Sequence, residues 1–119
     1  MSSITNPVLD NTIFILRRAF KKNGAEIWKA AAEFLSKSRS RRAAVNVGKI
    51  ARLTGKGDLI VVPGKVLGAG LLDHKLTVGA FTFSQAAKEK IREAGGQALN
   101  LVDFVHEHPS GKGVRLVGG

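Results

Sequence analysis

The sequence predicts an α/β domain with an irregular, loop-rich sheet, preceded by N-terminal helices. Apolar residues recur at helical spacing up to about residue 36, and beyond it short β-branched runs alternate with short helical segments. With 119 residues, of which 44% are hydrophobic, the chain is long enough for one domain with a core of modest size. We therefore expect an N-terminal helical segment, residues 1–36, packed on a basic α/β core, residues 37–119.

The first helix is predicted to start at Asn6-Pro7. An asparagine side chain can accept from the free N–H groups of a first turn, and proline loses no needed donor there. Four apolar residues then mark one helical face: Leu9, Ile13, Leu16 and Phe20. Four cations gather toward the end of the helix: Arg17, Arg18, Lys21 and Lys22. They suit the helix dipole and equally suit RNA contact, so both interpretations stay open.

A second helix is predicted to follow the Asn23-Gly24 stop. Its inward residues are expected to be Ile27, Ala31, Phe34 and Leu35. Trp28 lies near its start, and a single tryptophan inside an apolar periodic segment favours packing in the core over stacking on a base.

The remaining elements are shorter. Asn46 is expected to cap a helix through Leu53 that buries Val47, Ile50 and also Leu53. Further predictions, in chain order, are a strand Leu59–Val62 ended by Pro63-Gly64, a strand Leu76–Phe83, a helix from Ser84 to Gly95-Gly96, a strand Gln97–Leu101, a helical turn Val102–His106 and a strand Val114–Val117.

Positive charge is concentrated in residues 37–70. This segment holds eight Lys or Arg and one acid, Asp58, and so carries +7 of the net charge of +10. The rest of the chain has eleven basic and eight acidic residues, a net +3. Clustered positive charge interleaved with glycines is what a polyanion-binding face needs, and nucleic acid, RNA above all, is the predicted partner.

The run Lys37–Arg42 is the most basic stretch. It has four basic residues and two serines and nothing apolar, so it is expected to be an exposed loop. Arg39, Arg41 and Arg42 are suited to bidentate contact with phosphates.

Several other chemistries lack their residues. The chain has no cysteine, which excludes disulfides, thiolate nucleophiles and cysteine-based zinc sites. Its N-terminus lacks a signal-peptide pattern and its longest apolar run, Leu59–Val62, is too short to span a bilayer, so a cytoplasmic protein without a membrane partner is expected.

Nucleotide and metal sites are not predicted either. The glycines of residues 55–70 match neither the P-loop nor the dinucleotide spacing, and are better explained by close approach of two backbones. A metal at His74, His106 or His108 would need a further ligand that the sequence does not place. We find no catalytic constellation and expect no cofactor and no small-molecule substrate.

Motifs along nearly the whole chain resemble a known family. They are Asn6-Pro7, Ile27-Trp28-Lys29, Val45-Asn46-Val47, Ile50-Ala-Arg52, Gly57-Asp58, the block Ile60-Val-Val-Pro-Gly-Lys-Val-Leu-Gly68, Phe83-Ser84, Lys90-Ile91, Gly95-Gly96 and Pro109-Ser-Gly-Lys-Gly-Val-Arg115. Together they resemble the large-subunit ribosomal protein family L-eighteen-e in its short archaeal form. The block from Ile60 to Gly68 is the most specific of them.

The resemblance implies a superhelix of strand-strand-helix turns, similar to the C-terminal domain of the L-fifteen ribosomal protein. It also implies a structural constituent of the large ribosomal subunit, with rRNA and neighbouring ribosomal proteins as partners and no catalysis. The RNA-binding residues that it implies are Arg39, Arg41, Arg42, Lys49, Arg52, Lys56, Lys65, Lys112 and Arg115.

Two alternatives remain at this stage. A small enzyme acting on nucleotides or phosphorylated metabolites would use the loop Gly64–Gly70 with Asp73 and His74. A free regulatory nucleic-acid binder would share the electrostatics of a ribosomal protein but would be found outside ribosomes.

Overall fold

The computed structural model describes residues 6–37 and 43–118, which form five helices and five strands. The helices are α1 (Pro7–Asn23), α2 (Glu26–Ser36), α3 (Val47–Leu53), α4 (Gln85–Glu93) and α5 (Leu101–Glu107). The strands are β1 (Ala43–Asn46), β2 (Leu59–Leu67), β3 (Thr77–Phe83), β4 (Gln97–Asn100) and β5 (Val114–Leu116). None of these helices is long and apolar enough to cross a bilayer.

All strand pairs of the sheet are parallel, in the order β1-β2-β3-β4, with β5 also paired to β2. β2 is long enough to hold two short partners on the edge away from β3. Its first part, residues 59–61, pairs with β5, and its last part, residues 64–67, pairs with β1. Because parallel neighbours need crossover connections, the helices come to lie on the two faces of the sheet.

The prediction that Pro63-Gly64 ends the strand is wrong, since β2 continues to Leu67. Val62 pairs with Ala80 and Lys65 with Thr82, so β2 carries one extra residue there, a β-bulge. Pro63 lies between the stretch paired with β5 and the stretch paired with β1, where a missing N–H costs little. β1 itself was not predicted.

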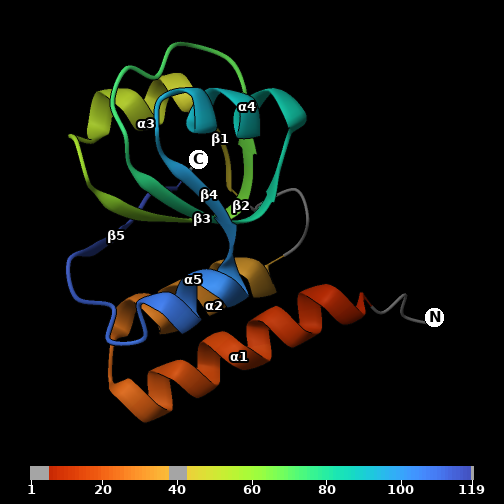
Figure 1. Ribbon diagram of the computed structural model, residues 1–119. Helices are drawn as coiled ribbons and strands as arrows, with labels where there is room; N and C mark the ends of the chain where they lie inside the picture. Colours follow the sequence, from red (N-terminus) through yellow and green to blue (C-terminus); the bar gives the residue numbers. More distant parts are fainter. Residues whose placement is uncertain (1–5, 38–42, 119) are drawn as a thin grey trace.

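The molecule is layered (Figure 1). α3 and α4 cover one face of the sheet, around a core that includes Ile50, Val62 and Ile91. α2 and α5 cover the other face, in a second core with Trp28 and Phe104. α1 packs on α2 and α5 from outside and is the outermost layer (Figure 1). The predicted α/β class is confirmed, and its parallel sheet is the new detail.

The N-terminal helices follow the local signals closely. The Asn6 side chain accepts from the N–H of Leu9 at 3.1 Å, and Gly24 ends α1 in the left-handed region at φ 74°. Trp28 is fully buried, as predicted, and its indole N–H donates to the carbonyl of Pro109 at 2.9 Å. That bond joins α2 to the segment before β5. The division of the chain at residue 36 stays a prediction.

Other boundaries and faces shift modestly. In α2 the fully buried side includes Ala32, while Ile27 and Phe34 are only partly buried. Leu53 is 47% exposed, so the prediction that α3 buries it is wrong. Leu101 opens α5 rather than ending β4, because Asn100 caps that helix by accepting from the N–H of Asp103.

Candidate nucleic-acid interface

The centre of the candidate interface is α3, which turns two cations outward. Val47 and Ile50 face the core, as predicted, because they lie three residues apart on one side of the helix. On the other side Arg52 is exposed and Lys49 is half-buried. The pairing of an apolar and a basic face thus fixes α3 on the sheet with its cations toward solvent.

Lys49 is partly committed to the fold. Its Nζ donates to the carbonyl oxygen of Gly118 at 3.0 Å, which ties the segment after β5 to α3. The ammonium has three donors, so this bond leaves the group able to bond a phosphate as well.

Arg115 of β5 lies at the C-terminal end of α3. One guanidinium nitrogen donates to the carbonyl of Leu53 at 2.8 Å and to Oδ2 of Asp58 at 2.9 Å. It therefore satisfies a carbonyl that the last turn leaves unpaired. The same Asp58 oxygen accepts from the N–H of Gly55 at 2.8 Å. The Gly55 bond is the main cause that holds the pKa of Asp58 below its ordinary value. Desolvation opposes it, and Arg115 and the nearby His74 lower the pKa further.

This contact has an electrostatic consequence. Asp58 is the single acid of residues 37–70, and its charge is balanced by a cation from outside that segment. The one carboxylate of the segment is therefore already neutralised, and it does not offset the charge of the segment's eight basic residues. The positive field of the segment is therefore stronger than its sequence suggests.

A groove of about 390 Å³ lies beside the two cations of α3. It is lined by Ala44, Val45, Asn46, Gly48, Lys49, Arg52, Ala69 and Gly70. One wall comes from β1 and α3, and the other from the loop after β2. A groove with cations on one wall and glycine backbone on the other suits a sugar-phosphate strand.

The glycine wall is held by backbone contact. The N–H of Gly48 donates to the carbonyl of Ala69 at 2.9 Å, and the side chain of Asn46 accepts from the N–H of Ala69 at 3.1 Å. A Cβ on Gly70, whose φ is 97°, would lie 2.5 Å from the Cα of Gly48. The expectation that these glycines let two backbones approach is confirmed, and both belong to this chain. Asn46 does precede α3, but its side chain bonds the loop rather than the first turn.

Lys90 of α4 completes the support of this loop, and sequence reasoning missed it. Its Nζ donates to the carbonyls of Gly68 and Gly70, each at 2.6 Å. The partners are backbone groups 20 and 22 residues away, so no side-chain pattern could have pointed to them.

The other predicted residues are spread along the surface. Lys56 is exposed in the turn after α3, and Lys65 is exposed on β2, paired with Ala44 of β1. Lys112 is exposed just before β5, next to Gly111, which packs on α2. Arg39, Arg41 and Arg42 lie outside the described residues. The structure thus gathers Lys49, Arg52 and Arg115 at α3, places Lys65 on the strand beside Ala44 of the groove, and places Lys112 just before β5.

Comparison with known proteins identifies the family. Residues 7–119 match the family described as ribosomal protein 60S L18 and 50S L18e. The chain is 44% identical over 113 residues to the large ribosomal subunit protein eL18 of Pyrobaculum aerophilum, a match that covers 95% of this chain and 93% of that protein. The chain belongs to the L18/L18e family of ribosomal proteins.

Other archaeal relatives agree. The protein of the same name from Methanothermobacter thermautotrophicus is 44% identical over 113 residues, covering 95% of this chain and 93% of that protein. That from Archaeoglobus fulgidus is 43% identical, covering 95% of this chain and 97% of that protein. The resemblance that the motifs suggested is confirmed. This member of the L18e family is a structural component of the large ribosomal subunit and is not an enzyme.

Asp73 and His74, which the enzymatic alternative would use for catalysis, instead stabilise the fold. His74 lies between Asp73, 2.9 Å from Nδ1, and the Thr54 hydroxyl, 2.8 Å from Nε2. This order imitates a catalytic triad, but the Thr54 hydroxyl also lies 2.7 Å from the carbonyl of Ile50 and so closes the end of α3. The imidazole N–H holds the pKa of Asp73 below its ordinary value. Among the described residues, no group of three His, Asp or Glu is placed to hold a metal ion.

Proposed function

We propose that this chain binds large-subunit rRNA through a basic, glycine-rich surface centred on α3. The observation that supports it best is the groove of about 390 Å³, in which Lys49 and Arg52 face a loop held by Lys90. Because that loop is already bonded within the protein, little ordering is needed when RNA enters.

The remaining predicted residues extend this surface. Arg39, Arg41 and Arg42 directly precede β1, whose Ala44 lines the groove. Lys56, Lys65, Lys112 and Arg115 are exposed and would contact neighbouring phosphates. Recognition is by phosphate pattern, shape and 2′-hydroxyl groups, because the deep groove of A-form RNA hides its base edges. The chain would act in the cytoplasm, within the ribosome, beside neighbouring ribosomal proteins.

Binding should depend steeply on salt. If about six of the nine named cations contact phosphates, log K for an rRNA fragment falls with log salt with a slope of about −4 to −5. Arg52→Ala should reduce the slope by about 0.7 to 0.9. Lys29→Ala removes the same charge from an exposed helical site on the other side of the sheet, and should leave the slope unchanged. Equal effects of the two variants would show that only net charge matters and would refute the α3 surface.

The basic run Lys37–Arg42 is tested separately. Arg41→Ala with Arg42→Ala should weaken binding of the rRNA fragment while the far-UV circular dichroism stays that of the unchanged protein. Unfolding of that double variant would mean that the arginines serve the fold instead.

Sedimentation separates a ribosomal constituent from a free regulatory binder. Cell lysate is fractionated at high magnesium after a high-salt wash, and the chain is detected across the gradient. We expect it in the large-subunit peak at one copy per subunit. The chain free at the top of the gradient would favour the regulatory alternative.

A further inference from the structure

The outward face of α1 carries an aromatic ring among cations, and the α3 surface does not account for it. α1 buries Thr12, Leu16 and Ala19 against the second core. The residues at helical spacing on the opposite side are Asp10, Phe14, Arg18 and Lys21, all exposed. We call these four residues the α1 ridge.

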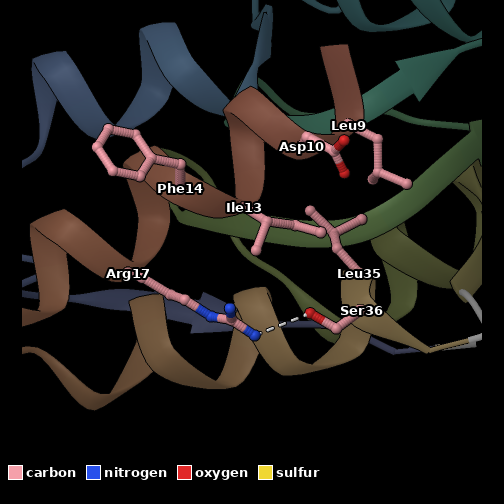
Figure 2. A pocket seen from close by; sticks show the side chains of 7 residues that line it. All are labelled: Leu9, Asp10, Ile13, Phe14, Arg17, Leu35 and Ser36. Atoms are coloured by element: carbon pink, nitrogen blue, oxygen red, sulfur yellow. Dashed lines mark hydrogen bonds between the residues drawn. The ribbon is translucent and has the colours of Figure 1, made fainter. Parts of the chain in front are cut away.

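Phe14 is 59% exposed at the middle of this ridge. In Figure 2 Leu9 and Ile13 turn toward Leu35 of α2, whereas the Phe14 ring points away from that contact. Packing of α1 on α2 therefore needs its neighbours and not the phenyl ring. A single exposed apolar residue is ordinary, so Phe14 carries meaning only through the groups around it.

Those groups are cations. Arg17, Arg18, Lys21 and Lys22 all lie within eight residues after Phe14. The one acid of α1, Asp10, lies in the first turn. In the part of the chain that the structure describes, the ion pairs are Arg115 with Asp58 and His74 with Asp73, so none of the four is paired with a carboxylate. The helix dipole explains Lys21 and Lys22 in the last turn, but it falls off before Arg18 and says nothing of Phe14.

Grooves lie on both sides of the ridge. One, of about 420 Å³, is lined by residues of α1 and the end of α2, among them Phe14 and Arg17, whose guanidinium donates to the Ser36 hydroxyl at 3.2 Å (Figure 2). The other, of about 390 Å³, lies between α1 and α5 and includes Arg18, Lys22 and His106. The groove between α1 and α5 thus has an apolar floor and a basic rim, whereas the rim of the other groove holds Asp10 as well as Arg17.

We propose that the α1 ridge binds a single-stranded segment of RNA, with an unpaired base stacked on Phe14 and the adjoining phosphates held by Arg18, Lys21 and Lys22. A flat apolar ring beside uncompensated cations complements a ligand that has both a π-face and a regular series of negative charges. Asp10 limits the phosphate path to the C-terminal half of the helix. A protein partner would have to supply several carboxylates arranged around one apolar side chain. RNA meets the same demand with its repeating phosphates and bases, so it is the simpler ligand for the ridge.

The position of α1 gives this site its role. α1 is the outermost layer on the side of the sheet opposite to α3 (Figure 1). A strand of RNA on the ridge and another at α3 are therefore separate contacts, and the protein would join two RNA segments. The ridge does not depend on the α3 surface, so either site can fail alone.

The experiment uses an indole as a local reporter. Phe14→Trp places an exposed indole on the ridge, while the native Trp28 is fully buried and bonded to Pro109. The full chain is titrated with a single-stranded RNA oligonucleotide and, separately, with inorganic polyphosphate of equal charge. We expect the new fluorescence to be quenched by the RNA and not by polyphosphate, because only bases can stack. Fluorescence that is unchanged by RNA would overturn the proposal.

Affinity separates stacking from simple apolar contact. Phe14→Ala and Phe14→Leu should each weaken binding of the oligonucleotide by about 5- to 100-fold, because leucine keeps apolar surface but has no ring to stack. Val8→Ala is the matched control, because Val8 is 67% exposed on the same helix and lies about 120° around it from Phe14. Unchanged affinity in Phe14→Leu would overturn the proposal and indicate a protein partner on this face.

The two proposals are distinguished by one cross-test. RNA should quench the fluorescence of the double variant Phe14→Trp with Arg52→Ala as it does that of Phe14→Trp alone. Arg52→Ala should reduce the salt slope by the same amount whether or not Phe14→Ala is also present. The proposal for the α1 ridge alone would be overturned if RNA quenched neither Phe14→Trp nor the double variant Phe14→Trp with Arg52→Ala, while Arg52→Ala still reduced the salt slope.

Discussion

Substituting Gly70 by alanine should damage the groove at α3 more than the same change does at another glycine. Gly70 has φ 97°, and a Cβ there would lie 2.5 Å from the Cα of Gly48 and 2.8 Å from its nitrogen. Both contacts are to backbone, which cannot swing aside as a flexible side chain can. The loop must move away from α3, and the two hydrogen bonds that Ala69 makes to Gly48 and Asn46 are lost.

The magnitude follows from two contributions. An alanine held in the left-handed region costs about 1–2 kcal/mol. The two hydrogen bonds contribute about 1 kcal/mol each, so Gly70→Ala should lower the free energy of unfolding by about 3–4 kcal/mol. Gly57→Ala is the matched control, because Gly57 has φ 82° but nothing lies within 4 Å of a Cβ there. It should show the conformational cost alone, about 1–2 kcal/mol.

Urea unfolding followed by circular dichroism measures both variants, and hydrogen exchange at the Gly48 amide reports the local opening. Exchange of that amide should be faster in Gly70→Ala and unchanged in Gly57→Ala. Equal losses of stability in the two variants, with the Gly48 amide still protected, would show that the loop accommodates the Cβ and would refute the argument from backbone contact. Binding of the rRNA fragment should weaken only in Gly70→Ala.

Three further predictions concern the supports of the fold. The pKa of Asp58 is lowered in the folded protein, so its carboxylate contributes stability above its ordinary pKa of 3.8, and that contribution is lost as the pH falls through the lower folded value. Asp58→Asn should therefore be less stable than the unchanged protein in urea at pH 7, and the difference should close below about pH 4; a difference that persists at pH 2 would contradict this. Lys90→Met keeps the packing of the side-chain stem but removes the donors to two carbonyls, and should lower the free energy of unfolding in urea by about 1–3 kcal/mol. Lys88→Met, at an exposed site of the same helix, should cause no measurable loss. Gly79→Ala places a Cβ 2.6 Å from the ring of Phe104 and should cost about 1–3 kcal/mol, and a smaller cost in a Phe104→Leu background would show that the ring is the obstacle.

Local signals in the sequence predicted most of the elements correctly. The Asn6 cap, the Gly24 stop and the helix start at Ser84 each depend on one or two neighbouring residues, and all three stand in the structure. The burial of Trp28 and the two faces of α3 followed from helical spacing. The charge composition indicated residues 37–70 as the nucleic-acid-binding segment, and the motifs indicated the family.

The errors arose where pairing partners decide the outcome. Pro63 reads as the end of a strand, but β2 continues because β1 and β5 pair with it on either side of the proline. β1 has four residues and depends for its hydrogen bonds on β2, so no pattern of its own predicted it. Asn46 stands at a helix start, yet its side chain found a partner 23 residues away.

Periodicity, caps and charge are short-range properties of the chain, and they were enough to predict the class of the fold, the family and the basic character of the surface. Which cations lie together, and what each of them is bonded to, depends on long-range packing. Arg115 reaches Asp58 across 57 residues, and Lys90 reaches Gly68 across 22, so both are drawn into the support of α3 and its groove. Such contacts depend on the packing of whole layers, which brings remote backbone carbonyls within reach of a side chain and leaves no mark in the local pattern.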